Sequence, residues 1–421
     1  VLALTPREAA RYRSLQLPPK LRDLQTQGGT WLEGPDGSTA GLFPRDRRPG
    51  TALVLWILAL QGLGLGAFLL FQPALRGLPD RGWMLGKTIG LLVFAFAAWL
   101  LASLRLLTFT PTSLRALFFP FAVAAAVVGW RRRRSIARLL GRRWRLLAAE
   151  ELIFWLLFAL LLGVRWLNPD LWHPFRGGEK PMDLAYLNAV VRSSFFPPFD
   201  PWFAGGWLNY YYFGFVLTAT LTLLTRVPTE LAYNLAVPTF FALTAAGAIS
   251  TVSTLARSRF GSLGPDRSGS LATRRAGAGL PAWQSLRHSR ALAWGAAGAT
   301  ILLLVGNLGT LRLWLGALAR LSDIDFPSRI PLLPETVRAA HGFLRLLSGA
   351  RLPIEEHQWY WDASRVIPHP PSEPAPITEF PLFTFLFADL HAHLMALPVA
   401  VLVLALLSLS LIHISEPTRR H

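Results

Sequence analysis

Residues 51–71 read TALVLWILALQGLGLGAFLLF, an apolar stretch without a charged side chain. A helix of about 17 to 25 mostly apolar residues can cross the hydrocarbon core of a bilayer. Similar stretches follow at residues 88–108, 113–130, 151–166, 207–225, 229–255 and 291–318, and another begins near Met395. Because backbone polar groups in lipid must bond within their own segment, the sequence predicts an all-α polytopic membrane protein of about seven to eight transmembrane helices.

The composition agrees with this fold class, with 52% hydrophobic and 16% charged residues. The net charge of +18 arises from arginines that cluster beside apolar segments, as in Arg131–Arg134. The positive-inside rule places this cluster in the cytoplasm. Membrane topology and contact with anionic lipid therefore explain the charge better than nucleic acid does, and we expect no nucleic-acid partner. The chain has no cysteine, which excludes disulfides and thiolate metal sites.

Polar segments divide the chain. Residues 1–50 are rich in proline, glycine and arginine, and we expect a loop left from an upstream part. Residues 51–411 form the predicted membrane domain, in which residues 177–209 and 322–381 are two polar loops. Residues 412–421 resemble translated sequencing-adapter sequence, so we expect them to be an artefact.

Alternation of the apolar segments places residues 177–209 outside the cytoplasm. The same count places the basic linker, residues 256–290, outside as well, although its arginines favour the cytoplasm. A broken or re-entrant segment around Pro238 would change the parity, and the sequence leaves both alternatives open. We expect function where the two polar loops meet, which requires both loops on one face and favours the placement given by the charge rule.

The first polar loop contains a predicted surface helix. Pro181 suits the first position of a helix and places Asp183 in its first turn, where the helix dipole favours a carboxylate. An apolar stripe of Leu184, Leu187, Val190 and Val191 then predicts that the helix lies along the membrane. If the helix includes Glu179, this residue shares a face with Asp183, and the pair could hold a metal or act as acid and base. Alternatively, Asp183 caps the helix and Glu179 pairs with Lys180 or Arg176.

Two aromatic segments have two interpretations each. Tyr210, Tyr211 and Tyr212 suit an aromatic belt at the membrane interface or a groove lined with hydroxyls. Trp361 and Arg365 suit a sugar ring and a phosphate, or an anchor on lipid.

The segment Asp389-x-His391-x-His393 offers carboxylate and imidazole ligands that suit Zn, Mn or Fe, and Glu379 opens the same stretch. If the segment is extended, the side chains of Asp389, His391 and His393 lie on the same side, whereas in a helix only Asp389 and His393 do. The alternative is a set of interfacial polar residues before a membrane span.

Several motifs occur in an order that resembles the uncharacterised YYY membrane-protein family, named for its triple tyrosine. The resemblance covers residues 51–411, and the motifs that carry it are Gly177–Asp183, Asp200–Trp202, Asn209–Gly214, Glu379–Pro381 and Asp389–His391. The layout is in turn similar to polytopic glycosyltransferases of the GT-C class, in which a large first extracytoplasmic loop contains acidic residues.

The GT-C resemblance implies a membrane glycosyltransferase that moves a sugar from a polyprenyl-phosphate donor to an extracytoplasmic acceptor. Glu179 and Asp183 take the acidic catalytic role. Asp389, His391 and His393 would bind a divalent metal (Mg, Mn or Zn) or the donor phosphate. The expected substrate-binding residues are Lys180, Asp200, Trp202, Asn209, Tyr210, Tyr211, Tyr212, Trp361, Arg365 and Glu379. A lipid or polymer transporter and a membrane-bound metal-dependent hydrolase stay open as alternatives.

Overall fold

The computed structural model describes residues 48–172, 178–203, 205–261, 282–306, 308–355, 358–370, 372–373 and 375–415. The expected upstream loop, the centre of the basic linker and the end of the expected artefact therefore lie outside the described residues. The chain divides into two compact units: unit 1 is Val1–Leu292 with Asp389–His421, and unit 2 is Ala293–Ala388.

Helices make up almost all regular structure in the described residues. Unit 1 contains α3 (Pro49–Phe71), α4 (Gly86–Ser103), α5 (Pro111–Arg131), α6 (Arg133–Leu167), α7 (Lys180–Arg192), α8 (Phe213–Thr225), α9 (Thr229–Gly261) and α15 (Ala392–Ser415). Helix α10 (Ala282–Thr300) crosses the boundary between the units. Unit 2 continues with η4 (Ile301–Val305), α11 (Gly309–Arg320), α12 (Leu333–Leu347), α13 (Gln358–Trp361), η5 (Asp362–Ser364) and α14 (Pro381–Phe387).

Among the described residues, six helices are long and apolar enough to cross a membrane, namely α3, α4, α5, α6, α9 and α15. A seventh span is possible if residues 290–305 and 309–320 count as one, although these two helices are bent by 71°. The polytopic all-α fold is therefore confirmed. The predicted span over residues 291–318 is interrupted by a bend near Gly306, whose φ is +51°.

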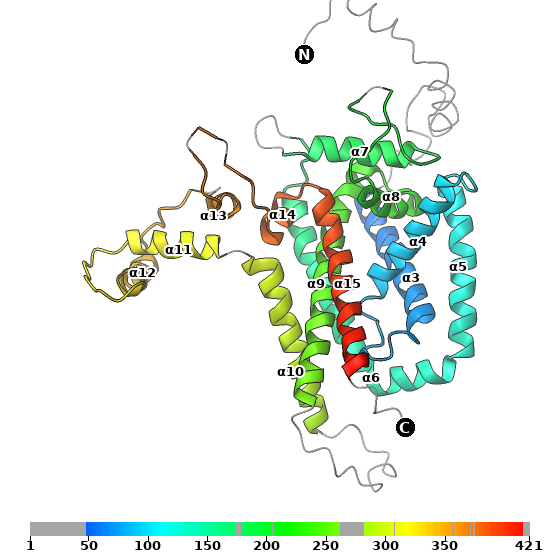
Figure 1. Ribbon diagram of the computed structural model, residues 1–421, viewed down its shortest axis with the longest axis horizontal. Coiled ribbons are helices and arrows are strands. Elements are labelled where there is room, and N and C mark those ends of the chain that lie inside the picture. Colours follow the sequence, from blue (N-terminus) through cyan, green and yellow to red (C-terminus); the bar gives the residue numbers. More distant parts are fainter. Residues whose placement is uncertain are drawn as a thin grey trace, which may run out of the picture. The chain divides into compact units, whose positions relative to one another are not determined.

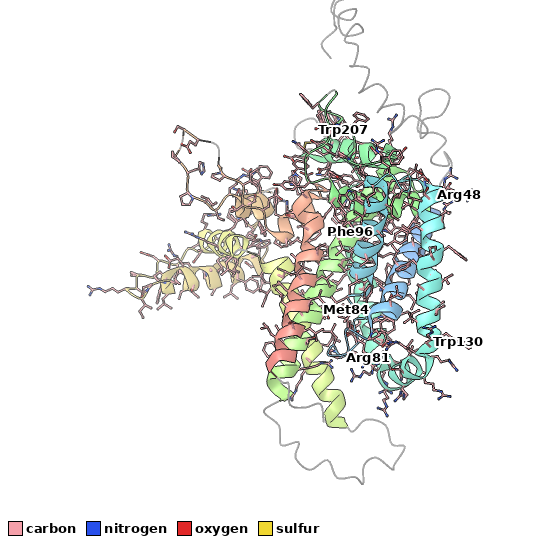
Figure 2. The ribbon with its side chains drawn as sticks, turned by 45° about the vertical axis from the view of Figure 1, so that its right-hand side comes forward. Arg48, Arg81, Met84, Phe96, Trp130 and Trp207 are labelled. Atoms are coloured by element: carbon pink, nitrogen blue, oxygen red, sulfur yellow. The ribbon has the colours of Figure 1, made fainter. Side chains whose placement is uncertain are left out.

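The spanning helices give unit 1 two ends. Figure 2 shows Arg48 and Trp207 near one end, and Arg81 and Trp130 near the other. Helix α7 lies across the first end, crosswise to the long helices (Figure 1), as its amphipathic pattern predicts. We call this the α7 end. The opposite end contains Arg131–Arg134, at the junction of α5 and α6, and we call it the arginine end.

Helix α8 does not cross the membrane, contrary to the expectation for residues 207–225. Its first residue, Phe213, contacts Trp99 at the end of α4, and its Leu224 carbonyl accepts a hydrogen bond from Arg115 at the start of α5. Both contacts lie at the α7 end. With 13 residues, the helix is about 20 Å long at roughly 1.5 Å per residue, shorter than the ~30 Å hydrocarbon core. Its apolar residues are buried among other helices of unit 1 rather than facing lipid.

The short α8 resolves the conflict over topology. Arg165, near the end of α6, donates a hydrogen bond to Asn234, near the start of α9, at 2.7 Å. At the arginine end, Arg257 of α9 interacts electrostatically with Glu150 of α6. Helix α9 therefore begins at the α7 end and runs to the arginine end (Figure 1). The start of the basic linker therefore lies at the same end of unit 1 as Arg131–Arg134, as the charge rule requires and the count of apolar segments does not.

Close approaches between helices hold unit 1 together. Helix α9 packs against α6 on one side and α15 on another. Helices α3 and α4 touch through their backbones, since a Cβ at Gly90 would lie 2.2 Å from the carbonyl oxygen of Leu63. Small residues allow this contact, which is typical of helices packed within membranes. The rigid bundle positions the loops at the α7 end.

Candidate functional site

Helix α7 turns charged as well as apolar side chains toward the protein. Its buried residues recur every three or four positions, which defines one helical face, and they are Lys180, Asp183, Tyr186, Leu187, Val190 and Val191. Leu184, which the sequence placed on the apolar stripe, is only half-buried. Burial of two charged residues costs free energy unless they are paired, so this end of α7 is a candidate site.

Asp389 joins the start of α7 to the start of α15. Its Oδ1 accepts a hydrogen bond from Lys180 Nζ at 3.0 Å, and its Oδ2 accepts one from the backbone N–H of Glu179 at 2.9 Å. Both side chains of the ion pair are about nine-tenths buried. The carboxylate therefore satisfies an amide at the positive end of the helix dipole as well as the ammonium.

Asp183 is completely buried beside this pair. Its Oδ2 accepts a hydrogen bond from the hydroxyl of Tyr233 at 3.4 Å, whereas its Oδ1 is buried with no hydrogen-bond partner among the described residues. The Tyr233 hydroxyl in turn accepts a hydrogen bond from the backbone N–H of Leu390 at 2.7 Å. Burial, reinforced by the nearby charges of Asp389 and Glu179, raises the pKa of Asp183 from 3.8 to about 8. The carboxyl group is therefore mostly protonated at neutral pH.

Glu179 and His391 form the accessible part of the cluster. The Oε2 of Glu179 lies 2.5 Å from Nε2 of His391, and the Glu179 side chain is half exposed. The rings of His391 and His393 are nearly perpendicular, with centroids 5.2 Å apart. A carboxylate and two imidazoles thus lead from the start of α7 toward the surface.

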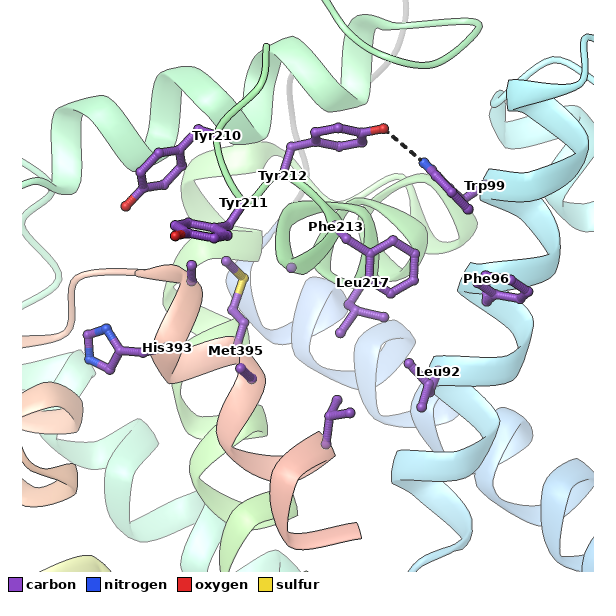
Figure 3. Close-up of a pocket in the computed structure, with 14 residues that line it drawn as sticks. Leu92, Phe96, Trp99, Tyr210, Tyr211, Tyr212, Phe213, Leu217, His393 and Met395 are labelled. Atoms are coloured by element: carbon purple, nitrogen blue, oxygen red, sulfur yellow. Dashed lines mark hydrogen bonds between the residues drawn. The ribbon is translucent and has the colours of Figure 1, made fainter. Parts of the chain in front are cut away.

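A groove of about 910 Å³ lies beside His393 and has mostly apolar walls. Figure 3 shows α4 on one side and α15 on the other, with the triple tyrosine above. Its lining includes Leu92, Phe96 and Trp99 from α4, and His393, Met395 and Val399 from α15. Because His393 belongs to both features, the groove leads to the carboxylate–histidine cluster.

The three tyrosines line the same groove but are held differently. Tyr210 stacks on Tyr186, with ring centroids 5.4 Å apart. The hydroxyl of Tyr212 accepts a hydrogen bond from Trp99 Nε1 at 3.2 Å (Figure 3). Tyr211 is 74% exposed. The geometry agrees with the groove interpretation of this motif, with Tyr210 and Tyr212 as its supports and Tyr211 at its surface.

The rest of the first polar loop builds its own turn. Asp200 Oδ1 accepts hydrogen bonds from the backbone N–H groups of Trp202 and Phe203, at 2.8 and 3.1 Å. The Trp202 side chain is exposed, and so is Asn209. These contacts give Asp200 a structural task, and binding of substrate by these three residues stays a prediction.

The predicted site residues of unit 2 contact one another locally. The guanidinium of Arg365 lies 4.1 Å from the ring centroid of Trp361, and burial lowers the pKa of Arg365. One carboxylate oxygen of Glu379 accepts a hydrogen bond from the Thr384 hydroxyl at 3.1 Å. One face of Trp361 is therefore stacked on arginine rather than open to a sugar. The expected meeting of the two polar loops stays a prediction.

The contacts of Asp389 do not fit the expected metal site. A dication bound by Asp389, His391 and His393 would face the Lys180 ammonium, which lies 3.0 Å from Asp389 Oδ1. The other carboxylate oxygen is bonded to an amide, and His391 is bonded to Glu179. Asp389 is therefore held by protein donors, whereas His391 and His393 are among side chains that could hold a metal ion, and metal binding stays a prediction.

The family model described as "Uncharacterized membrane protein (DUF2298)" matches residues 93–421. The chain belongs to this family. Neither the curated proteins nor the solved structures include a match to it. The matched residues contain α7, the triple tyrosine, Asp389 and the two histidines.

Two residues of this DUF2298 member were missed by the sequence interpretation. Tyr233 is fully buried in α9, and Arg165 is buried near the end of α6. Both are polar side chains within segments expected to span the membrane, where polar groups are costly and tend to have partners. That signal would have selected them as candidates, but it could not have named Asp183 and Asn234 as their partners.

Proposed function

We propose that this family member is a membrane glycosyltransferase that transfers a sugar from a polyprenyl-phosphate donor to an acceptor hydroxyl outside the cytoplasm. The observation that supports this most is the connection between the apolar groove and the Glu179–His391 pair through His393. A lipid-linked donor needs both features, because its chain is apolar and its reacting group is polar. The resemblance of the layout to GT-C enzymes points to the same activity.

The extracytoplasmic side is supported by the arginines. Arg131–Arg134 lie at the end of unit 1 opposite to α7 (Figure 1). If the positive-inside rule holds for this chain, the carboxylate cluster faces away from the cytoplasm. Lipid-linked sugars on that leaflet could enter the groove sideways, between α4 and α15.

The contacts divide the two acidic residues into different roles. Glu179 is half exposed and can approach an acceptor, whereas Asp183 is completely buried. We therefore assign the role of general base to Glu179. Asp183 and Tyr233 act as positioning residues, because the Tyr233 hydroxyl bonds both Asp183 and the backbone of Leu390, next to His391.

The proposed step balances without a further reactant. Glu179 removes the proton of the acceptor hydroxyl, whose oxygen forms a bond to the anomeric carbon. The bond from that carbon to the phosphate oxygen breaks, and the polyprenyl phosphate leaves with the electron pair. In this proposal His391 and His393, whose rings contact each other, donate hydrogen bonds to the departing phosphate. A positioned general base typically contributes about 10² to 10⁴ in rate.

A transfer assay tests the proposal. The protein in native membranes is incubated with radiolabelled polyprenyl-phosphate sugars and membrane extract, and labelled product is measured for the wild type, Glu179→Gln and Asp183→Asn. Glu230→Gln is the matched control, because this exposed carboxylate lies in the first turn of α9 at the same end of unit 1.

We expect transfer in the wild type and the control, a loss in Glu179→Gln and a reduction in Asp183→Asn. Unchanged transfer in Glu179→Gln would show that Glu179 is not the general base. A lack of transfer from any donor would move the assignment to transport. Release of free sugar that a chelator stops would move it to a metal-dependent hydrolase.

A further inference from the structure

Two helices of unit 2 expose apolar side chains in stripes. On α11 the exposed residues Leu308, Leu311 and Leu315 are spaced by three and four positions, and the exposed Trp314 lies beside them. On α12 the exposed residues Phe343, Leu344 and Leu347 show the same spacing. Residues at these spacings share one face of a helix. Each helix therefore has a contiguous apolar face.

These apolar faces are not used for packing α11 against α12. The contact between the two helices involves the buried Ala317 and Ala339, and the backbones meet at Gly342. A Cβ at Gly342 would lie 1.8 Å from the carbonyl oxygen of Leu318. The two helices thus use their small residues for each other and keep their large apolar residues outside.

Arginines occupy other faces of the same helices. On a helical projection, Arg320 lies away from the leucine stripe of α11, and Arg338 and Arg345 lie away from that of α12, whereas Arg312 lies at the edge of the α11 stripe. Residues 309–351 contain more arginines than acids: Arg312, Arg320, Arg329, Arg338, Arg345 and Arg351 against Asp323, Asp325 and Glu335. An apolar face beside a basic one is the pattern of helices that bind anionic membrane surfaces.

The chain also leads α11 to a membrane boundary. Residues 290–305 and 309–320 together pass as a membrane span, but the two helices are bent by 71°. If the first helix crosses the bilayer, α11 turns away steeply from it at the bend near Gly306. With 12 and 15 residues, α11 and α12 are both too short to cross on their own.

We propose that α11 and α12 lie in the membrane–water interface, with their apolar stripes among the lipid chains and their arginines on anionic headgroups. A lipid surface explains the apolar stripe, the arginine excess and the steep bend together. Trp314 suits this location, since indole rings favour the headgroup region. The proposal concerns unit 2 alone and does not depend on glycosyl transfer.

The absence of cysteine from the chain makes a depth measurement possible. Single cysteines at Leu315 and Leu344 are spin-labelled in the full chain, reconstituted in nanodiscs with and without phosphatidylglycerol. Matched controls are Arg320→Cys and Arg345→Cys, one on each helix. Accessibility is measured toward oxygen, which concentrates in lipid, and toward a polar nickel chelate, which stays in water.

We expect labels at Leu315 and Leu344 to be more accessible to oxygen than to nickel, and labels at the two arginine positions to show the reverse. Adding phosphatidylglycerol should deepen the leucine positions. Equal access of nickel to all four labels would overturn the proposal, because both helices would then lie in water. Protection of the leucine positions from both reagents would also overturn it, because a protein surface would then cover the stripes.

A further variant tests whether α11 and α12 stay packed against each other in lipid. Gly342→Ala, made together with Leu344→Cys, should separate α11 from α12 because of the contact with Leu318. The line shape of the Leu344 label should then show faster motion than in the parent. If the parent label already moves as fast as in Gly342→Ala, the helix pair is not formed in lipid and the proposal fails.

Discussion

Two buried lysine–carboxylate pairs lie in unit 1, and their surroundings differ. Lys87 and Glu151 form one pair at 2.8 Å, and Lys180 and Asp389 form the other at 3.0 Å. In the first pair, Glu151 also accepts hydrogen bonds from the indole N–H groups of Trp83 and Trp155, at 3.0 and 2.6 Å. Both oxygens of Glu151 therefore accept hydrogen bonds from protein donors. We call this pair closed, because neither oxygen is left for a ligand.

The second pair stands next to groups that are not closed. Asp183 keeps one buried oxygen without a partner among the described residues, and Glu179 is half exposed. Buried polar groups in native proteins are normally hydrogen-bonded. Glu150, beside the first pair, also has a buried oxygen without a hydrogen-bond partner among the described residues, so the half exposure of Glu179 is what distinguishes the second pair. The comparison teaches that the same charges stabilise the fold where they are saturated and can serve chemistry where they are not.

The largest expected difference between the two pairs is in activity. Glu179→Gln should lower sugar transfer by about 10² to 10⁴, because the neutral amide cannot accept the acceptor proton. Glu151→Gln should leave transfer per folded molecule unchanged, because its contacts lie within α4 and α6 and the loop between α3 and α4. The transfer assay with quantified folded protein measures both. Equal losses in the two variants would show that the comparison is wrong.

Breaking the closed pair should mainly affect stability. Lys87→Met leaves the partly buried carboxylate of Glu151 without its cation, and the cost of about 3 to 5 kcal/mol for a fully buried pair is the upper limit of the expected loss. Thermal unfolding in detergent measures the change. The double variant Lys87→Met/Glu151→Leu should recover most of the stability, and a failure to recover would mean that packing, rather than charge, accounts for the loss.

Removing the hydroxyl of Tyr233 tests the link between α7 and the histidine segment. Tyr233→Phe leaves the Leu390 N–H and the Asp183 carboxyl without this partner, at a cost of about 1 to 3 kcal/mol. The effects of Tyr233→Phe and Asp183→Asn should not add in a double-mutant cycle of unfolding free energies, because the two residues bond each other. Additive effects would show that Asp183 and Tyr233 contribute to stability independently of each other.

The raised pKa of Asp183 predicts how stability depends on pH. Between its ordinary value of 3.8 and about 8, the folded protein holds this proton while the unfolded chain releases it. Stability should therefore fall as the pH rises toward 8 and change little above it, with a slope of at most ~1.4 kcal/mol per pH unit. Melting temperatures across pH 6 to 9 should show this fall in the wild type, and Asp183→Asn should flatten it. A slope that persists in the variant would place the titration elsewhere.

The smallest effect is expected at Trp202, whose side chain is 63% exposed. Trp202→Ala should change the unfolding free energy by less than about 0.5 kcal/mol, as exposed substitutions usually do. The turn should persist, because Asp200 accepts a hydrogen bond from the backbone N–H of residue 202 and not from its side chain. A large loss of transfer with unchanged stability would instead assign Trp202 to substrate binding and extend the site along the first loop.

The sequence by itself determined the properties that depend on neighbouring residues. Apolar length gave the membrane-spanning helices, and the spacing of apolar residues after Pro181 gave the surface helix α7. The charge rule also predicted that the basic linker starts at the same end as the arginine cluster, where the count of apolar segments failed. The motifs also pointed to Glu179, Asp183, Asp389 and His391, which the structure brings together.

Only the tertiary structure decided which groups meet and which are buried. Residues 207–225 are apolar enough for a span, yet α8 is buried against other helices and ends on the side where it began. Lys180 and Asp389 are 209 positions apart in the sequence, and Tyr233 reaches Asp183 from another helix. Hydropathy and periodicity describe a segment in isolation, whereas pairing and burial are set by the packing of segments that are distant in the chain. That packing makes Glu179 accessible, leaves an oxygen of Asp183 unbonded and raises the pKa of Asp183.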